Sequence, residues 1–220
     1  MADCDRERVA RLFDDIARAD LGSSENAAET GTSIPALAGR VAFEKLELRP
    51  DDVLLDVGTG TGDIAIAAAC ICRQVIGIDV SRTSLDQARI KAKREHLDNV
   101  IFSYGAFEDP CAELDLSAYD ITKILAVYSL HHLPDPMKKQ SLLELTGLLH
   151  RPGRMVIGDI MFFDDPDKHR DRFDEAGYDE GDTDFPSRAE YLRDCLEQTG
   201  ARVQVERVHP IVGVVIADFA

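Results

Sequence analysis

The chain has 220 residues, of which 45% are hydrophobic and 30% are charged, and its formal net charge is −16 at pH 7. This length and composition are typical of one globular domain with a sizeable core. The acidic balance argues against DNA and anionic membranes as partners and disfavours RNA, because neutralising phosphates requires a basic surface.

The residues before the first core strand contain two predicted helices. Residues 6–19 predict an amphipathic helix, because apolar residues recur at helical spacing between charges. Residues 22–33 are rich in Gly, Ser, Thr, Asn and Ala and therefore predict a loop. A second helix is expected over residues 35–48, where Pro35 suits the first turn.

From residue 53 onward, apolar runs that predict strands alternate with segments that predict helices. The expected strands cover residues 53–57, 75–80, 100–104, 124–128, 154–160, 203–208 and 212–219. The expected helices begin after Asp63 and then cover residues 81–96, 136–149 and 188–199. Such alternation predicts a parallel sheet covered by helices on both faces, and the last two strands suit a closing β-hairpin.

The cysteines give no sign of a disulfide framework. They are Cys4, Cys70, Cys72, Cys111 and Cys195, an odd number without a CxxC pair. No signal-peptide pattern and no apolar run of about 18 residues is present. We therefore expect a cytoplasmic protein without membrane insertion.

The chain is organised around a strand–turn–helix stretch at residues 53–67. Gly58, Gly60 and Gly62 alternate with threonines directly after the first buried strand. Glycine permits φ > 0 and close approach to a ligand, and a helix start presents free N–H groups. The spacing is G-x-G-x-G rather than the dinucleotide G-x-G-x-x-G, and no P-loop lysine follows. Asp56 would repel phosphates but can pair with an ammonium group.

This D-x-G-x-G-x-G pattern resembles the first motif of class I S-adenosylmethionine-dependent methyltransferases. The resemblance spans about residues 48–160. Residues 126–135 are similar to the post-strand motif of the small-molecule branch, whereas the Asn/Asp-Pro-Pro-Tyr motif of DNA amino-methyltransferases is absent. Residues 12–17 and 60–63 loosely resemble quinone-pathway C-methyltransferases, although residues expected after the first helix of that group are missing.

The resemblance implies one α/β domain with a Rossmann-like three-layer αβα sandwich. Its seven-stranded, mostly parallel sheet would end in an antiparallel C-terminal hairpin. We expect an N-terminal helical lid over residues 1–48, a cofactor-binding core over 49–160, an acidic and aromatic cap segment over 161–187, and a C-terminal helix and hairpin over 188–220. The implied cofactor is S-adenosyl-L-methionine, with S-adenosyl-L-homocysteine as product, bound across the carboxyl ends of the strands.

Three parts of the cofactor are assigned to three loops. Asp56 and Gly58 are expected at the amino-acid end. Asp79 stands about twenty residues after the glycine loop, where an acid can accept both ribose hydroxyls; the alternative is a cap for the next helix. The full set of expected cofactor-binding residues is Asp56, Gly58, Thr59, Gly60, Gly62, Asp79, Val80, Ala106, Phe107, Glu108, Ala126 and Val127.

The remaining contacts concern the adenine and the methionine part. Val80 is expected to pack against the adenine face. Family members often carry an aspartate where this chain has Ala106. The backbone of residues 106–107 is therefore expected to contact the adenine edge, with Phe107 near the ring. Whether Glu108 contacts the adenine amino group in place of that aspartate stays open. The backbone of Ala126 and Val127 is expected to face the methionine part.

The sequence identifies no catalytic residue, and His131 is the one candidate, as a base needed only if the acceptor must lose a proton. Adjacent side chains of an extended segment point to opposite sides, so His131 and His132 are not expected to share a metal. Asp164, Asp165 and Asp167 lack the glycine and terminal glutamate of a calcium loop. We therefore predict no metal.

Three functions remain open for this chain, which we expect to be a monomer or homodimer. The first is methyl transfer to a small-molecule acceptor, and the second is methyl transfer to protein or RNA. The third is S-adenosylmethionine binding by a non-catalytic regulator. The sequence names neither the acceptor nor the methylated atom.

Overall fold

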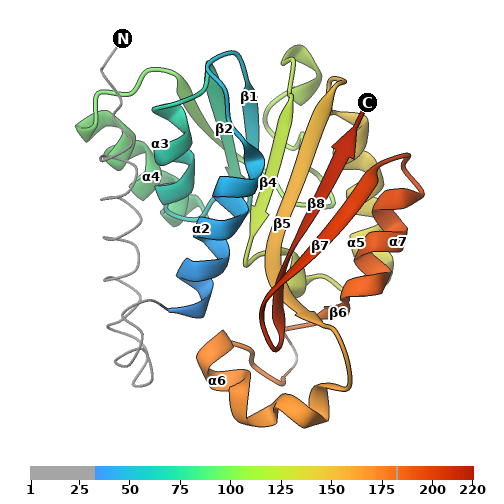
Figure 1. Cartoon of the computed structure of the whole chain (residues 1–220). Helices are drawn as coiled ribbons and strands as arrows, with labels where there is room; N and C mark the ends of the chain where they lie inside the picture. Colours follow the sequence, from blue (N-terminus) through green and yellow to red (C-terminus); the bar gives the residue numbers. More distant parts are fainter. Residues whose placement is uncertain (1–32, 182) are drawn as a thin grey trace.

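The computed structural model describes residues 33–181 and 183–220. The helix expected over residues 6–19, and with it most of the N-terminal lid over residues 1–48, lies outside the described residues. The described chain forms one mixed sheet with helices on both faces, as the alternation of strands and helices predicts (Figure 1).

The sheet has the strand order β3-β2-β1-β4-β5-β8-β7. The strands are β1 (Val53–Val57), β2 (Gln74–Asp79), β3 (Val100–Tyr104), β4 (Lys123–Val127), β5 (Gly153–Phe162), β7 (Arg202–His209) and β8 (Val212–Phe219). The first five are parallel to one another, and β8 pairs antiparallel with both β5 and β7. The predicted seven strands with an antiparallel C-terminal hairpin are confirmed. A two-residue strand, β6 (Ser187–Arg188), adds an eighth beside the end of β5.

Helices cover both faces of the sheet and complete the three layers. They are α2 (Ile34–Leu46), α3 (Asp63–Ala69), α4 (Arg82–Arg94), α5 (Asp135–Gly147) and α7 (Ala189–Glu197). Residues of α2, α3 and α4 belong to one apolar cluster, and residues of α5 and α7 belong to another. In β1, Leu55 belongs to the cluster with α5 and α7, whereas its neighbour Leu54 belongs to the one with α2, α3 and α4. Successive strand side chains point to opposite faces, so a central strand buried on both faces is apolar throughout.

The carboxyl ends of the parallel strands meet at one edge of the sheet, and β1 lies there between β2 and β4. The chain leaves β1 toward β2 on one side and later returns to β4 on the other, which makes this the topological switch point of the sheet. Ligands of open α/β sheets bind at such a point, outside the carboxyl ends of the strands. The loops after β1, β2, β3 and β4 therefore meet where the cofactor is expected.

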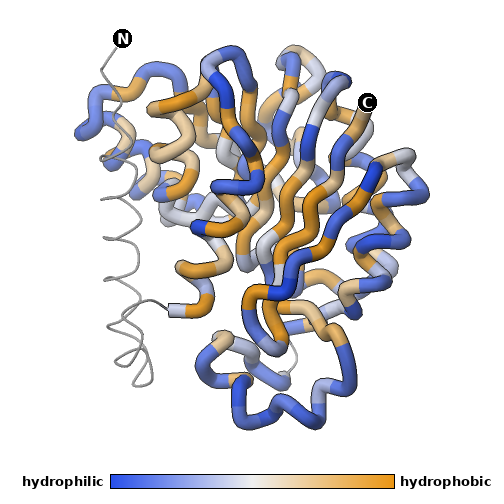
Figure 2. Tube along the Cα trace, viewed as in Figure 1, coloured by the Kyte–Doolittle hydropathy of each residue, from blue (hydrophilic) through white to orange (hydrophobic). Residues whose placement is uncertain are grey.

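The segment between β5 and β6 folds as a cap below this edge (Figure 1). It contains a 3-10 helix, η4 (Pro166–Arg172), and the short helix α6 (Phe173–Ala176). Most of its residues are hydrophilic (Figure 2), but Phe173 packs in an apolar cluster with Ala38 of α2 and Ile211 at the hairpin tip. His209 of β7 also pairs with Glu175 at 2.9 Å. The cap is therefore attached both to α2 and to the C-terminal hairpin.

Candidate functional site

The glycine loop after β1 adopts the conformation for which the sequence requires glycine. Gly58, Gly60 and Gly62 have φ of 75°, 54° and 78°. A Cβ at Gly62 would lie 2.7 Å from Ala88 and 2.8 Å from Phe102, so this glycine allows α4 to approach the loop. A Cβ at Gly60 would meet nothing within 4 Å. Gly60 therefore faces open space, as a backbone that approaches a ligand closely would.

Asp56 is a buried carboxylate at the end of β1 beside this loop. Asp56 is only 3% exposed, and its Oδ2 accepts a 2.6 Å hydrogen bond from the Thr59 hydroxyl. Burial raises the pKa of Asp56 to about 6, against the lowering effect of Thr59, and the charge of Asp79 raises it further. A cationic ligand group would stabilise the ionised form. Asp56, the residue expected at the ammonium group, is therefore a buried carboxylate whose ionised form a cationic ligand group would stabilise.

Asp79 links the tip of β2 to the glycine loop. Its Oδ2 accepts from the Gly60 amide at 2.8 Å, and its Oδ1 accepts from the Ser81 amide at 2.7 Å. Each carboxylate oxygen has capacity for a second donor, such as a ribose hydroxyl. Ser81, and not Asp79, caps α4, because the Ser81 hydroxyl accepts from the Ser84 amide. Val80 next to Asp79 is 61% exposed, which suits a residue that packs on a ligand ring.

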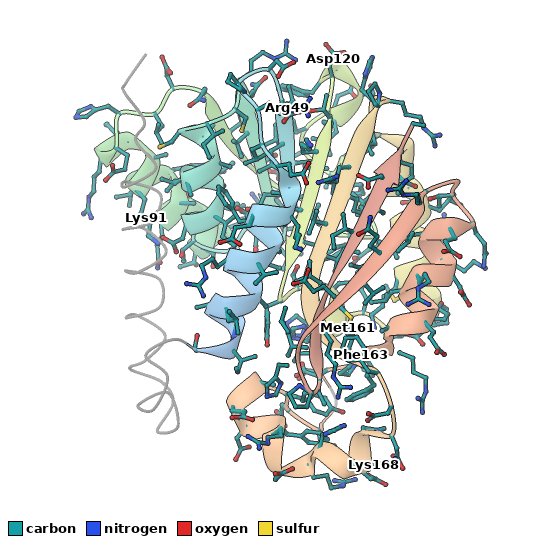
Figure 3. All side chains as sticks on the ribbon, viewed as in Figure 1. Arg49, Lys91, Asp120, Met161, Phe163 and Lys168 are labelled. Atoms are coloured by element: carbon teal, nitrogen blue, oxygen red, sulfur yellow. The ribbon has the colours of Figure 1, made fainter. Side chains whose placement is uncertain are left out.

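A lysine that the sequence reasoning missed holds the start of α3. Lys91 of α4 donates to both carboxylate oxygens of Asp63, at 2.7 and 2.8 Å, and to the Thr61 hydroxyl at 2.9 Å (Figure 3). This clamp joins α4 to the last part of the glycine loop. No local sequence signal marks it, because the partners are about 30 residues apart.

The loop after β3 is arranged differently from its sequence expectation. The Ala106 amide donates to the Asp109 carbonyl at 3.1 Å, so this N–H is not free to read an adenine edge. The Phe107 side chain is 6% exposed and belongs to the core cluster under the sheet, where it anchors the loop. Glu108 is exposed. The Phe107 amide and the Glu108 side chain therefore remain the candidates for adenine contacts.

The residue that follows β4 combines two unusual features. Ala126 and Val127 are the last residues of β4, and Val127 is followed by Tyr128 with φ of 47°. A bulky residue rarely adopts positive φ, and such strain is concentrated at functional sites. The Tyr128 hydroxyl is one of two buried side-chain polar atoms in the described residues without a hydrogen-bond partner. Burial and the charge of Asp159 raise the pKa of Tyr128, so this hydroxyl keeps its proton and can donate.

His131 is held by a buried aspartate, Asp159 of β5. His131 Nδ1 lies 2.5 Å from Asp159 Oδ1, and because a carboxylate only accepts, this nitrogen carries the proton. The other oxygen of Asp159 accepts from the amides of residues 129–131, and Oδ1 also accepts from the Ile160 amide. Burial lowers the pKa of His131, but the hydrogen bond and charge of Asp159 raise it more, and the net shift is upward.

The prediction that His131 and His132 point to opposite sides of an extended segment is wrong. Leu130–His132 forms a 3-10 helix, η3, rather than an extended segment, and the ring centroids of His131 and His132 are 4.0 Å apart. Asp184 of the cap completes a group of three whose nitrogen and oxygen donor atoms all lie within 4.8 Å of one another. The 3-10 turn thus places the His131 and His132 side chains next to each other, an arrangement that an extended chain would not allow.

Lys138 and Asp159 are buried charged residues that the sequence reasoning also missed. Lys138 is 1% exposed and donates to the Phe185 carbonyl and, at 2.7 Å, to the Ser187 hydroxyl, which fixes the end of the cap on α5. Met161 in β5 and Phe163 just after it lie against Gly213 of β8, so the start of the cap segment packs on the hairpin (Figure 3). An acid inside an apolar run, as Asp159 is within residues 155–162 of β5, is a signal that could have been used, because buried charges require partners.

Comparison with known proteins gives the family of this chain. A family model described as a methyltransferase domain matches residues 48–204. An uncharacterized methyltransferase of Bacillus pumilus is 25% identical over 80% of this chain and 82% of its own length. The 27-O-demethylrifamycin SV methyltransferase of Amycolatopsis mediterranei is 32% identical, over 55% of this chain and 43% of its own.

Solved structures show the same fold at low identity. The geranyl diphosphate methyltransferase in complex with S-adenosylmethionine has a TM-score of 0.67 at 16% identity, covering 98% of this chain and 92% of that one. A putative methyltransferase in complex with the Trm112 activator of Haloferax volcanii has a TM-score of 0.67 at 16% identity, covering 96% of each chain. The family match, the fold and the glycine-loop geometry agree, and the chain belongs to the class I S-adenosylmethionine-dependent methyltransferases.

Proposed function

We propose that this enzyme transfers a methyl group from S-adenosylmethionine to a small-molecule acceptor bound between the end of β4, α2 and the cap. The observation that carries the proposal is Tyr128, which combines a strained backbone with a buried, unpaired hydroxyl. A buried donor without a partner costs on the order of 1–3 kcal/mol, so it is expected to have a partner in the working state. An acceptor atom would supply that partner.

The position of Tyr128 is suited to a reaction at the methyl group. It directly follows Val127, which the resemblance places at the methionine part of the cofactor. The sulfonium of the cofactor activates the methyl carbon, so the chain has mainly to bind and align the two reactants for in-line displacement. We assign Asp56 and Gly58 to the amino-acid end, Asp79 to the ribose, and Tyr128 to the acceptor.

The surroundings of Tyr128 favour an acceptor with an apolar part. Tyr128 packs with the cluster that contains Phe162, Phe173 and Tyr178, and the Tyr178 ring contacts both phenylalanine rings, with centroids 5.8 and 4.7 Å apart. The acidic exterior disfavours anionic acceptors by repulsion. The relative named for methylation of 27-O-demethylrifamycin SV supports an organic small molecule as the class of acceptor.

A macromolecular acceptor is the second candidate. A 23S rRNA (uracil(1939)-C(5))-methyltransferase of Legionella pneumophila is 30% identical over 38% of this chain, but this match covers only 19% of that protein. The net charge of −16 argues against RNA, because phosphate binding requires a basic surface. A non-catalytic regulator would bind the cofactor but transfer no methyl group.

The test combines binding with a transfer screen. Calorimetry should show S-adenosylhomocysteine binding and no comparable binding of NAD. Labelled S-adenosylmethionine is then offered with a metabolite library and, separately, with cell protein and RNA fractions. Labelling of metabolites that falls at least tenfold in Tyr128→Phe, with unchanged S-adenosylhomocysteine affinity, supports the proposal. Labelling confined to protein or RNA, or cofactor binding without transfer, overturns it.

We also propose that the cap opens and closes over the acceptor. Its residues are mostly hydrophilic (Figure 2), and its exposed side chains form ion pairs within the cap, such as Arg170 with Glu180. Hydrogen exchange over residues 164–181 should be fast without ligands and slower with S-adenosylhomocysteine and acceptor. Equal protection in all states would show that the cap is a permanently packed part of the fold. A cytoplasmic monomer or homodimer remains our proposal for location and assembly.

A further inference from the structure

Three donor atoms from two distant parts of the chain, residues 131–132 and Asp184, converge at the carboxyl edge of the sheet. His132 Nδ1 lies 3.2 Å from Asp184 Oδ1, and His131 Nε2 lies 3.9 Å from the same oxygen. The side chains of His131 and Asp184 are each 5% exposed, whereas that of His132 is 55% exposed. The cluster therefore has a buried floor and one side that is open to solvent.

The orientation of His131 is determined by Asp159. Since the Nδ1 proton is donated to Asp159 Oδ1 at 2.5 Å, the neutral imidazole presents a lone pair at Nε2, toward Asp184. Histidines that bind metals almost always donate their other N–H to a carboxylate or carbonyl in this way. Asp159 is 1% exposed and accepts four backbone N–H groups, so the orienting carboxylate is itself immobilised.

Asp184 is also held by hydrogen bonds within the cap. Its Oδ2 accepts from the Asp179 amide at 3.0 Å, and its Oδ1 accepts from the Thr183 hydroxyl at 3.3 Å and faces the two imidazoles. The next residue, Phe185, donates its amide to the His131 carbonyl at 2.7 Å, and its own carbonyl accepts from Lys138. The residue that follows the carboxylate is thus attached both to the histidine turn and to α5.

The charges and spacing of the group suit a bound cation. Two buried carboxylates, Asp159 and Asp184, face His131, while the nearby cation of Lys138 is engaged by Ser187 and Asp135. Ligands about 2.1 Å from a tetrahedral metal lie about 3.4 Å apart. The two nitrogens lie 3.2 and 3.9 Å from Asp184 Oδ1, and the donor atoms all lie within 4.8 Å of one another, so side-chain movements bring them to one ion. His132 Nδ1, which also lies 3.2 Å from the Thr183 carbonyl, would exchange that contact for the metal.

We propose that His131, His132 and Asp184 bind one divalent transition-metal ion of the zinc type. Two imidazole nitrogens and one carboxylate are the ligands of such ions, whereas Mg²⁺ and Ca²⁺ require oxygen ligands. Three protein ligands leave at least one position open. On the proposed function, which this step assumes, that position takes an oxygen or nitrogen atom of the acceptor and so selects acceptors able to coordinate a metal.

The test measures metal binding by the full chain without cofactor or acceptor. Zn²⁺ is titrated into the wild type, His132→Ala, Asp184→Asn and the surface control His150→Ala, and Mg²⁺ serves as the control ion. Zn²⁺ should bind with a stoichiometry of one, the affinity should fall more than tenfold in the first two variants, and His150→Ala should match the wild type. His132→Ala is expected to fold, because that side chain is largely exposed.

Absorption of the Co²⁺-loaded protein distinguishes this site from the cysteines. Nitrogen and oxygen ligation, lost in His132→Ala, supports the proposal. Sulfur-to-metal charge-transfer bands, or Zn²⁺ affinity that is unchanged in both His132→Ala and Asp184→Asn, overturn it. S-adenosylhomocysteine binding is measured on the same samples. If it persists while Zn²⁺ fails to bind, the metal site is refuted and the proposed methyl transfer is not.

Discussion

Replacing Asp56 with asparagine should make the protein more stable and its cofactor binding weaker. The Asp56 carboxylate is 3% exposed, and the pKa is raised from 3.8 to about 6, mainly by burial. A group whose folded pKa is raised binds its proton more tightly in the native state, so ionising Asp56 opposes folding. This cost is absent below the unfolded pKa of 3.8 and is complete above the folded pKa of about 6.

The magnitude follows from the two pKa values. At 1.36 kcal/mol for each unit, the cost of the ionised Asp56 is about 1.6 kcal/mol at pH 5 and about 3 kcal/mol at pH 8. Asparagine has the same shape, carries no charge, and can still accept from Thr59. The gain in unfolding free energy of Asp56→Asn should therefore increase by about 1.4 kcal/mol between pH 5 and pH 8.

Urea unfolding at pH 5 and pH 8 measures this difference. The matched control is Asp86→Asn on α4, whose side chain is 71% exposed and which should change stability by less than about 0.5 kcal/mol. Calorimetry on the same variants should show S-adenosylhomocysteine affinity lowered by about 1.5–3 kcal/mol in Asp56→Asn only. A stability gain that does not depend on pH, or none at all, would refute the assignment of a raised pKa to burial of this carboxylate.

Four further substitutions test the same site. Gly62→Ala should destabilise the fold by about 2–5 kcal/mol, because the new Cβ combines positive φ with contacts under 3 Å. Gly60→Ala should cost only about 1–2 kcal/mol of stability but block cofactor binding, because its Cβ would enter open space. Thermal unfolding measures the stability and calorimetry the binding, and equal destabilisation by the two variants would contradict this assignment. Asp79→Ala should lower S-adenosylhomocysteine affinity by about 1–3 kcal/mol, and unchanged affinity would limit Asp79 to holding the glycine loop. Tyr128→Phe should leave the unfolding free energy in urea unchanged or raise it by up to about 2 kcal/mol, and a clear loss of stability would mean that the hydroxyl has a partner in the fold.

Local patterns in the sequence were sufficient for the fold and the cofactor loop. Buried parallel strands are continuous apolar runs, and the turn after β1 needs positive φ at Gly58, Gly60 and Gly62, which only glycine adopts without strain. The Ser81 hydroxyl caps α4, and a serine directly before a helical run is a local signal for such a cap. These features depend on the chemistry of adjacent residues, so they can be read from a short stretch of chain.

The adenine loop and the acceptor side depended on contacts between distant segments. Whether Phe107 lies in the core or at the ligand is decided by packing under the sheet, and the Ala106 amide is taken by a turn that composition does not reveal. His131 meets Asp159 across 28 residues and Asp184 across 53, and the turn at residues 130–132 places both histidines on one side. Such pairings arise only when the sheet brings β4 and β5 together and the cap returns over their ends. The sequence therefore determined the fold and the glycine loop to which we assign S-adenosylmethionine. The tertiary structure alone decided which charged and aromatic side chains gather at the end of β4, because these come from separate segments.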